Sequence, residues 1–188
     1  MSRDGRTGHI AEDAVDQGTV GTMSNAVSFR DIQPEDFDDL HAMASDWEIV
    51  RQLGSWPWPP EPAFTRSRAK PYKGDGFIHG VFIEGRMVGT IGVTDGTLGY
   101  CLHQDVWGQG VGTRMMVHAL ACAFGNGVPK IIAEIWEDNA GSQALVRKFG
   151  FRHVENTVQF AKARKVDTVS LTFELTKDDW TAQQSLSS

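Results

Sequence analysis

The chain has 188 residues, of which 40% are hydrophobic and 22% charged, and its formal net charge at pH 7 is −6. This length suits one domain, and the composition is typical of a globular protein rather than of a disordered or fibrous one. No Lys/Arg block is long enough for a nucleic-acid surface, and no apolar run approaches the ~20 residues that span a bilayer. We therefore expect neither nucleic acid nor membrane as a partner. We also expect a cytoplasmic location, because residues 1–23 lack the apolar stretch of a secretory signal.

Composition shifts along the chain set the expected domain boundaries. Residues 1–24 are rich in Gly, Asp and Thr without hydrophobic periodicity, which predicts a flexible tail. We expect one domain over residues 25–180 and a loose C-terminal end over 181–188. Cys101 and Cys122 match no zinc spacing, so they are interpreted as buried structural thiols and no metal is expected.

The first half of the domain alternates short apolar runs with turn residues. Val27–Arg30 alternates as a strand, and acidic residues around Pro34 open a helix with apolar positions at helical spacing. Three apolar runs separated by Gly- and Asp-containing turns then predict an antiparallel meander. The elements expected here are a strand at 27–30, a helix from 33 to 44, a short helix at 47–53, a helical basic segment at 66–73, and strands at 77–83, 87–93 and 98–103.

The second half opens with the longest predicted helix, at 109–124, which carries one wide apolar stripe and ends at Gly125-Asn126-Gly127. A buried strand, a helix ended by Gly150 and two closing strands follow. Their expected ranges are 130–136, 140–149, 151–154 and 170–175. The order of elements indicates a mixed α/β fold with the antiparallel meander first.

A glycine-rich turn joins the third meander strand to the long helix, in the sequence Val106-Trp107-Gly108-Gln109-Gly110-Val111-Gly112-Thr113. Glycine lets the main chain approach a ligand, and the unpaired amides of a helix N-terminus bind anions such as a diphosphate. A Walker A loop is excluded, because no Gly-Lys-Ser/Thr ends the turn. A dinucleotide-binding fingerprint and a turn that only relieves crowding both stay open.

Two linked blocks identify a family resemblance. The segment 98–112 around the glycine turn, and the segment 134–151 with its Asn139-Ala140-Gly141-Ser142 motif and Gly150-Phe151 ending, resemble the GNAT superfamily of N-acetyltransferases. The tryptophan at position 107 is similar to the RimJ/RimL-like branch. With the meander, the resemblance covers about Val27 to Leu175.

The resemblance implies a GNAT fold: a mixed, mostly antiparallel sheet of six to seven strands, with strands 4 and 5 splayed apart and helices on its flanks. It implies acetyl-CoA as co-substrate, with its pantetheine arm in the gap between those strands. When the family's cofactor-binding positions are transferred to this sequence, the main chain of Leu102 and His103 would pair with pantetheine. Residues Gln109, Gly110, Val111, Gly112 and Thr113 would hold the pyrophosphate, Asn139 would bond the pantetheine arm, and Ser142 would sit near the sulfur.

The chain also departs from the family pattern. The tyrosine acid that many members carry seven residues after the asparagine is replaced by Val146, so Ser142 becomes the candidate partner of the departing thiolate. Trp107 stands where the pattern has an Arg or Gln, so backbone amides must carry more of the phosphate binding. Glu134 matches the position of a general-base glutamate and either acts through water or is a rim carboxylate. His79 is an alternative base.

The implied activity is transfer of an acetyl group to a primary amine by direct attack, the acceptor being a protein N-terminus or a small molecule. Trp56 and Trp58, in a proline-rich stretch before the meander, either line the acceptor pocket or close the core. A homodimer is a further expectation. Two alternatives remain open: an acyl-CoA-binding or sensing module that has lost catalysis, and a dinucleotide-binding protein.

Overall fold

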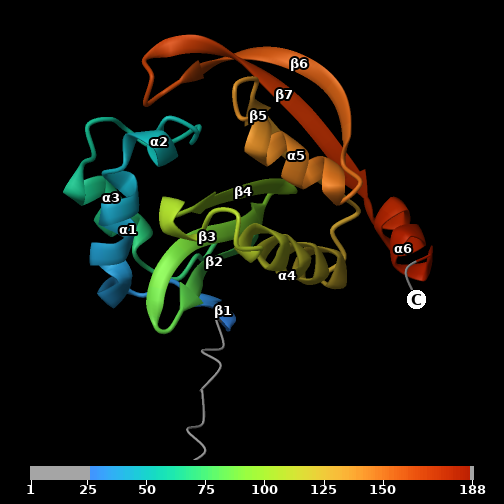
Figure 1. Cartoon of the computed structure of the whole chain (residues 1–188), viewed down its shortest axis with the longest axis horizontal. Coiled ribbons are helices and arrows are strands. Elements are labelled where there is room, and N and C mark those ends of the chain that lie inside the picture. Colours follow the sequence, from blue (N-terminus) through green and yellow to red (C-terminus); the bar gives the residue numbers. More distant parts are fainter. Residues whose placement is uncertain (1–25, 187–188) are drawn as a thin grey trace, which may run out of the picture.

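The computed structural model describes residues 26–186, which fold into one sheet with helices on both faces (Figure 1). The tail expected at residues 1–24 lies outside the described part of the chain. The strands are β1 (Val27–Asp31), β2 (Gly76–Ile83), β3 (Arg86–Thr94), β4 (Thr97–Leu102), β5 (Lys130–Trp136), β6 (Arg152–Ala161) and β7 (Val166–Thr176). The α-helices are α1 (Phe37–Ala44), α2 (Trp47–Val50), α3 (Pro62–Arg68), α4 (Val111–Gly125), α5 (Ala140–Lys148) and α6 (Lys177–Leu186), with short 3-10 helices η1 (Pro34–Asp36) and η2 (Gln104–Val106).

The sheet has seven strands in the order β1-β2-β3-β4-β5-β7-β6. Every neighbouring pair is antiparallel except β4 and β5, which are parallel. A parallel pair needs a crossover connection, and α4 provides it. The predicted fold class is confirmed, including the mixed sheet and the separation of strands 4 and 5. The doubly wound sheet of the dinucleotide alternative is not what these strands form.

Two apolar clusters pack on opposite faces of the sheet. The larger one joins α4 and α5 to the central strands and includes Met115, Met116 and Leu120, all fully buried. The smaller one joins α1 and the segment after it to the other face, where Phe82 and Met87 project. Strand alternation produces this division, because neighbouring side chains point to opposite faces. No helix among residues 26–186 is both long enough and apolar enough to cross a membrane.

The closing hairpin is longer than the sequence indicates. Strands were predicted only at 151–154 and 170–175, whereas β6 and β7 run for ten and eleven residues. Side chains along β6 are mostly exposed, among them Val158 and Phe160, so no buried face imposes an apolar–polar alternation. Main-chain pairing with β7 holds β6 in place instead. The hairpin forms one curved edge of the sheet, with its turn on the same side as α2 (Figure 1).

Two helices differ from their predicted ranges. The basic segment expected to be helical at 66–73 instead forms α3 from Pro62 to Arg68, because proline favours the first helical position and Pro71 disfavours continuation. The loose end expected from residue 181 needs correction for residues 181–186, which belong to α6. Thr176 Oγ1 accepts a hydrogen bond from Asp179 N–H at the start of α6, and the Trp180 ring stacks on Phe124.

A histidine pair links β2 to α4. His79 Nδ1 and His118 Nε2 are 2.9 Å apart, and Phe29 stacks on the His118 ring at 4.0 Å. Burial lowers the pKa of both imidazoles. The Asp31 carboxylate, 3.8 Å from His79, partly opposes the lowering of the His79 pKa. The neighbouring His79 ring lowers the His118 pKa further. The fold therefore favours the neutral form of the pair.

This pair predicts a loss of stability in mild acid. Because the folded pKa values lie below the unfolded value near 6.5, the unfolded chain takes up protons first, so stability is complete above about pH 6.5 and falls as the pH drops below it. Tm measured from pH 7.5 to 5.0 should fall, by roughly 2–4 °C for each kcal/mol lost. His118→Gln should flatten this dependence, and His153→Gln, on the exposed strand β6, should not. An unchanged slope in His118→Gln would contradict the assignment.

Candidate active site

The site begins where β4 and β5 separate. They are paired only at Thr97–Ile132 and Leu98–Ala133, although β4 stays paired with β3 as far as Leu102 and β5 with β7 as far as Trp136. Beyond the last shared pair, the facing edges of these two strands have no strand partner within the described sheet. A cleft of about 1200 Å³ opens between them. Unpaired main-chain donors and acceptors along such a gap suit an extended ligand that carries its own amides.

The glycine turn closes one end of this cleft. Gly108 and Gly110 line it and have left-handed φ angles of 73° and 77°. A Cβ at either position would meet no other atom within 4 Å, so both face open space, although a side chain in this conformation costs roughly 1–2 kcal/mol. Gly110 is the N-cap of α4 and supplies no capping side chain. The amides of the first turn of α4 are thus presented to the cleft with the positive end of the helix dipole.

A lysine that the sequence did not single out stands beside this turn. Lys148, at the end of α5, donates from Nζ to Thr113 Oγ1 at 3.0 Å, and both residues line the cleft. It provides a cation where Trp107 has replaced the polar residue of the family pattern. The Trp107 indole instead donates to the Leu102 carbonyl at 3.0 Å, bracing the turn against the end of β4. Lys148 is 35 residues from Thr113 in the chain, so no local motif could indicate the pair.

Three of the residues that the family resemblance assigned to cofactor binding do not line the cleft. The His103 N–H donates to Val88 O at 2.7 Å, so the main-chain donor predicted to pair with pantetheine is already used by β3. The Gln109 side chain turns back to Asp105 O at 2.6 Å. Neither residue lines the cleft, and the same is true of Val111, which is buried in the core. Leu102, Gly110, Gly112 and Thr113 do line it.

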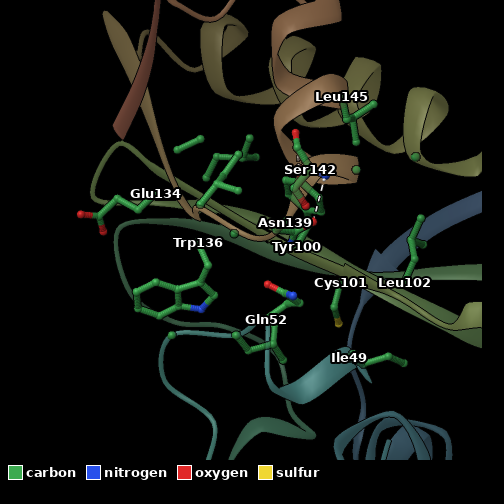
Figure 2. Close-up of a pocket in the computed structure, with 18 of the residues that line it drawn as sticks. Ile49, Gln52, Tyr100, Cys101, Leu102, Glu134, Trp136, Asn139, Ser142 and Leu145 are labelled. Carbon is green, nitrogen blue, oxygen red and sulfur yellow. Dashed lines mark hydrogen bonds between the residues drawn. The ribbon is translucent and has the colours of Figure 1, made fainter. Parts of the chain in front are cut away.

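The N-terminus of α5 forms the opposite wall. Asn139 caps this helix, accepting from Ser142 N–H at Oδ1 over 3.1 Å, which leaves the NH2 half of its amide for a ligand. Both residues line the cleft, and their contacts with a cofactor stay a prediction. Figure 2 shows Asn139 and Ser142 close to Tyr100, whose phenol donates to the Ser142 carbonyl at 3.5 Å. Burial raises the pKa of Tyr100 to about 12, and its hydrogen bond to Ser142 offsets only part of this shift.

The two candidate bases are placed differently. Glu134 lines the cleft and accepts from Gln159 Nε2 at 2.7 Å, but its carboxylate points away from Ser142 and Tyr100 (Figure 2). His79 is not brought to the cleft: β2 carries it to the β1 side of the sheet, where it pairs with His118. The cleft lining holds no residue of β2. Of these two side chains, only Glu134 is placed to act on a ligand there.

Ion pairs tie three distant segments together beside the cleft. Asp138, after β5, accepts from Arg51 Nη1 and from Arg164 Nη2, each at 2.9 Å. Arg164, in the β6–β7 turn, also donates to the Arg51 carbonyl at 2.7 Å. Partial burial alone would raise the pKa of Asp138, but the hydrogen bonds from the two guanidinium groups outweigh it and lower this pKa. Arg51 and Asp138 line the cleft, so the network holds the segment after α2 as one of its walls.

The two tryptophans of the proline-rich stretch close a core rather than line the cleft. Trp56 and Trp58 pack on a small cluster of Ala44, Val50 and Ala163. Neither is among the cleft-lining residues. The cluster joins α1 and α2 to the β6–β7 turn, so it supports the same wall as the Asp138 network.

Comparison with known proteins identifies the family. Residues 27–152 match the family model described as an acetyltransferase (GNAT) domain. The chain therefore belongs to the GNAT acetyltransferase family, and it is an acyltransferase.

Solved structures of other proteins share this fold. An N-acetyltransferase from Staphylococcus aureus Mu50 is 16% identical with a TM-score of 0.64, the match covering 80% of this chain and 98% of that one. The ribosomal-protein-S18-alanine N-acetyltransferase from Escherichia coli is 15% identical with a TM-score of 0.62, covering 80% and 94%. The ribosomal-protein-S5-alanine acetyltransferase from Vibrio fischeri is 17% identical with a TM-score of 0.62, covering 82% and 94%. At these identities the likeness supports the fold.

The Asp138 network predicts a measurable contribution to stability. Asp138→Asn keeps the side-chain shape but removes the charge that both guanidinium groups share, and partly exposed ion pairs contribute up to about 1 kcal/mol each. Tm at pH 7 should therefore fall by a few degrees, and 1 M NaCl should shrink the difference. Because the pKa of Asp138 is lowered in the fold, the stabilisation should be complete at neutral pH and vanish only in strong acid. Glu137→Gln, one residue earlier and exposed, should leave Tm unchanged; equal losses in both variants would contradict a specific role.

Proposed function

We propose that the protein transfers the acetyl group of acetyl-CoA to a primary amine by direct attack, the acceptor being a small molecule or a protein N-terminus. One observation supports this most: the gap between β4 and β5 leads directly to the open glycine turn at the start of α4. An extended arm with amide groups and a diphosphate at its end has the shape and chemistry that this combination accommodates.

The residues present fit such a co-substrate. First-turn amides of α4, the Thr113 hydroxyl and the Lys148 ammonium together offer neutral donors and one cation to a diphosphate. Along the gap, the main-chain edge of β4 before the Leu102 carbonyl and the Asn139 NH2 group would pair with the pantetheine amides; the Leu102 carbonyl already accepts from the Trp107 indole. When bound, the thioester supplies an activated acyl group, and the protein supplies position and proton transfer.

Glu134 is the proposed base. The acceptor amine must be neutral to attack, and the Glu134 carboxylate would take its proton through a bridging water, because it points away from Ser142 and Tyr100. Gln159, which donates to Glu134 Oε1, would hold the carboxylate in place. Ser142, at the N-terminus of α5, would donate from its hydroxyl toward the sulfur. Placed groups of this kind typically raise rates by about 10²–10⁴-fold.

A protein N-terminal amine is one acceptor compatible with the RimJ/RimL-like resemblance. Two of the structures with similar folds are named as ribosomal-protein alanine acetyltransferases. A small-molecule amine is the other, and a panel containing both kinds of acceptor would separate them.

Ligand-dependent stability tests the co-substrate before any acceptor is known. CoA at about 100 times its Kd should stabilise the fold by about 2.7 kcal/mol, and NAD should not. Lys148→Gln should weaken CoA binding several-fold, because it removes the cation beside the diphosphate, whereas Lys73→Gln, outside the cleft, should not. Thermal shift at matched ligand concentrations compares CoA with NAD, and Lys148→Gln with Lys73→Gln. Stabilisation by NAD and none by CoA would contradict the proposed co-substrate.

Turnover tests the catalytic assignments. Release of CoA thiol from acetyl-CoA, followed with the amine panel, should depend on the acceptor. Glu134→Gln should lower kcat/KM by roughly 10²-fold or more and leave CoA affinity unchanged, while Ser142→Ala should lower kcat less. Glu155→Gln, on β6 outside the cleft, serves as the matched control. Tight CoA binding without acceptor-dependent release would favour the sensing module over the enzyme.

A further inference from the structure

Tyr100 is the one phenol that lines the cleft, among the residues the structure describes. It projects from β4 on the same face as Leu98 and Leu102 and packs against the larger core cluster. Its hydroxyl reaches the N-terminal turn of α5, on the opposite wall, where it donates to the Ser142 carbonyl. The phenol therefore reaches from β4 to the start of α5.

The position that the family pattern gives to a tyrosine acid cannot serve here. Val146, on the second turn of α5, is fully buried among apolar side chains and carries no hydroxyl. Within the described cleft lining, the hydroxyl groups beside the start of α5 are those of Ser142 and Tyr100. Tyr100 offers the more acidic of these two protons, since an aliphatic alcohol is a much weaker acid than a phenol.

We propose that Tyr100 is the general acid of this acetyltransferase, donating its phenolic proton to the sulfur of the leaving CoA; this inference rests on the proposed acetyl transfer. As the amine nitrogen bonds to the acyl carbon, the carbon–sulfur bond breaks and its electron pair goes to sulfur. Tyr100 gives its proton to that sulfur, so the products are the amide and CoA thiol. Glu134 passes the proton that it took from the ammonium form of the acceptor to solvent before the attack. The second proton, which the nitrogen loses as it bonds to the acyl carbon, reaches the Tyr100 oxygen through Glu134 and water, which restores both side chains.

The present hydrogen bond of Tyr100 is compatible with this task. At 3.5 Å it is longer than the 2.5–3.0 Å typical of O–H···O bonds, so little is lost when the proton turns toward a sulfur. With a pKa of about 12, the phenol stays protonated through neutral and mildly alkaline pH, and a donor remains available whenever negative charge develops. Burial of the ring fixes its direction.

Binding measurements test the contact without relying on turnover. A Tyr100 donor should favour ionised CoA thiol, so the affinity for CoA should rise several-fold more between pH 7 and pH 9 than the affinity for desulfo-CoA, which lacks the sulfur. Tyr100→Phe keeps the ring and should abolish this difference while leaving desulfo-CoA binding and Tm unchanged. Tyr72→Phe, the matched substitution outside the cleft, should keep it. Isothermal titration calorimetry with each ligand at pH 7 and pH 9 measures these affinities.

Kinetics of the same variants complete the test. Tyr100→Phe should lower kcat about 10²-fold with little change in KM for acetyl-CoA. The inference would be overturned if Tyr100→Phe kept the wild-type kcat, or if its affinity for CoA still rose more with pH than its affinity for desulfo-CoA. Either result would leave acetyl transfer itself intact. Equal weakening of CoA and desulfo-CoA would also overturn it, because that pattern belongs to a packing role. If the wild-type protein binds no CoA, the proposed function itself fails.

Discussion

The limited pairing between β4 and β5 is the constraint on which the site depends. Each strand is held along its whole length by its outer neighbour, β3 or β7, while the two share only two residue pairs with each other. The sheet therefore stays continuous but opens at the carboxyl ends of two parallel strands. Both helices that follow these strands, α4 and α5, begin at this opening, so their N-terminal amides and positive dipole ends face one cleft.

The chemistry of the cleft follows from what each wall can offer. The β4 side supplies main-chain groups and Tyr100, and the α4 turn supplies amides that only glycine conformations leave accessible. The start of α5 supplies Asn139 and Ser142, and its end supplies Lys148. The amides and hydroxyls at these two helix starts, with the Lys148 ammonium beside them, suit a diphosphate and a developing charge on sulfur. Among residues 26–186 there is no cluster of three or more candidate metal ligands.

The wall beyond β5 is assembled from segments that are far apart in the chain. Asp138 connects the segment after α2 with the β6–β7 turn, and small apolar residues beneath Trp56 and Trp58 connect the same two regions. The proline-rich stretch is thus part of the scaffold that holds this side of the cleft. The residues of this wall lie outside the glycine turn, and one hydrogen bond, from Gln104 to Asp46 at the start of α2, connects the two regions.

The sequence by itself determined the elements whose signal is local. Apolar periodicity identified α4, the turn residues delimited the meander of β2, β3 and β4, and the glycine turn and the Asn139–Ser142 motif located both helix starts at the cleft. Tertiary structure alone decided the length of β6, which has no buried face to leave a pattern, and the helical end after Trp180. It also decided that His103 is used by β3, that His79 pairs with His118 away from the cleft, and that Lys148 and Tyr100 face it. These outcomes depend on hydrogen bonds and packing between residues that are far apart in the chain. Periodicity and spacing depend only on residues that are close together in the sequence, so they could not predict such contacts.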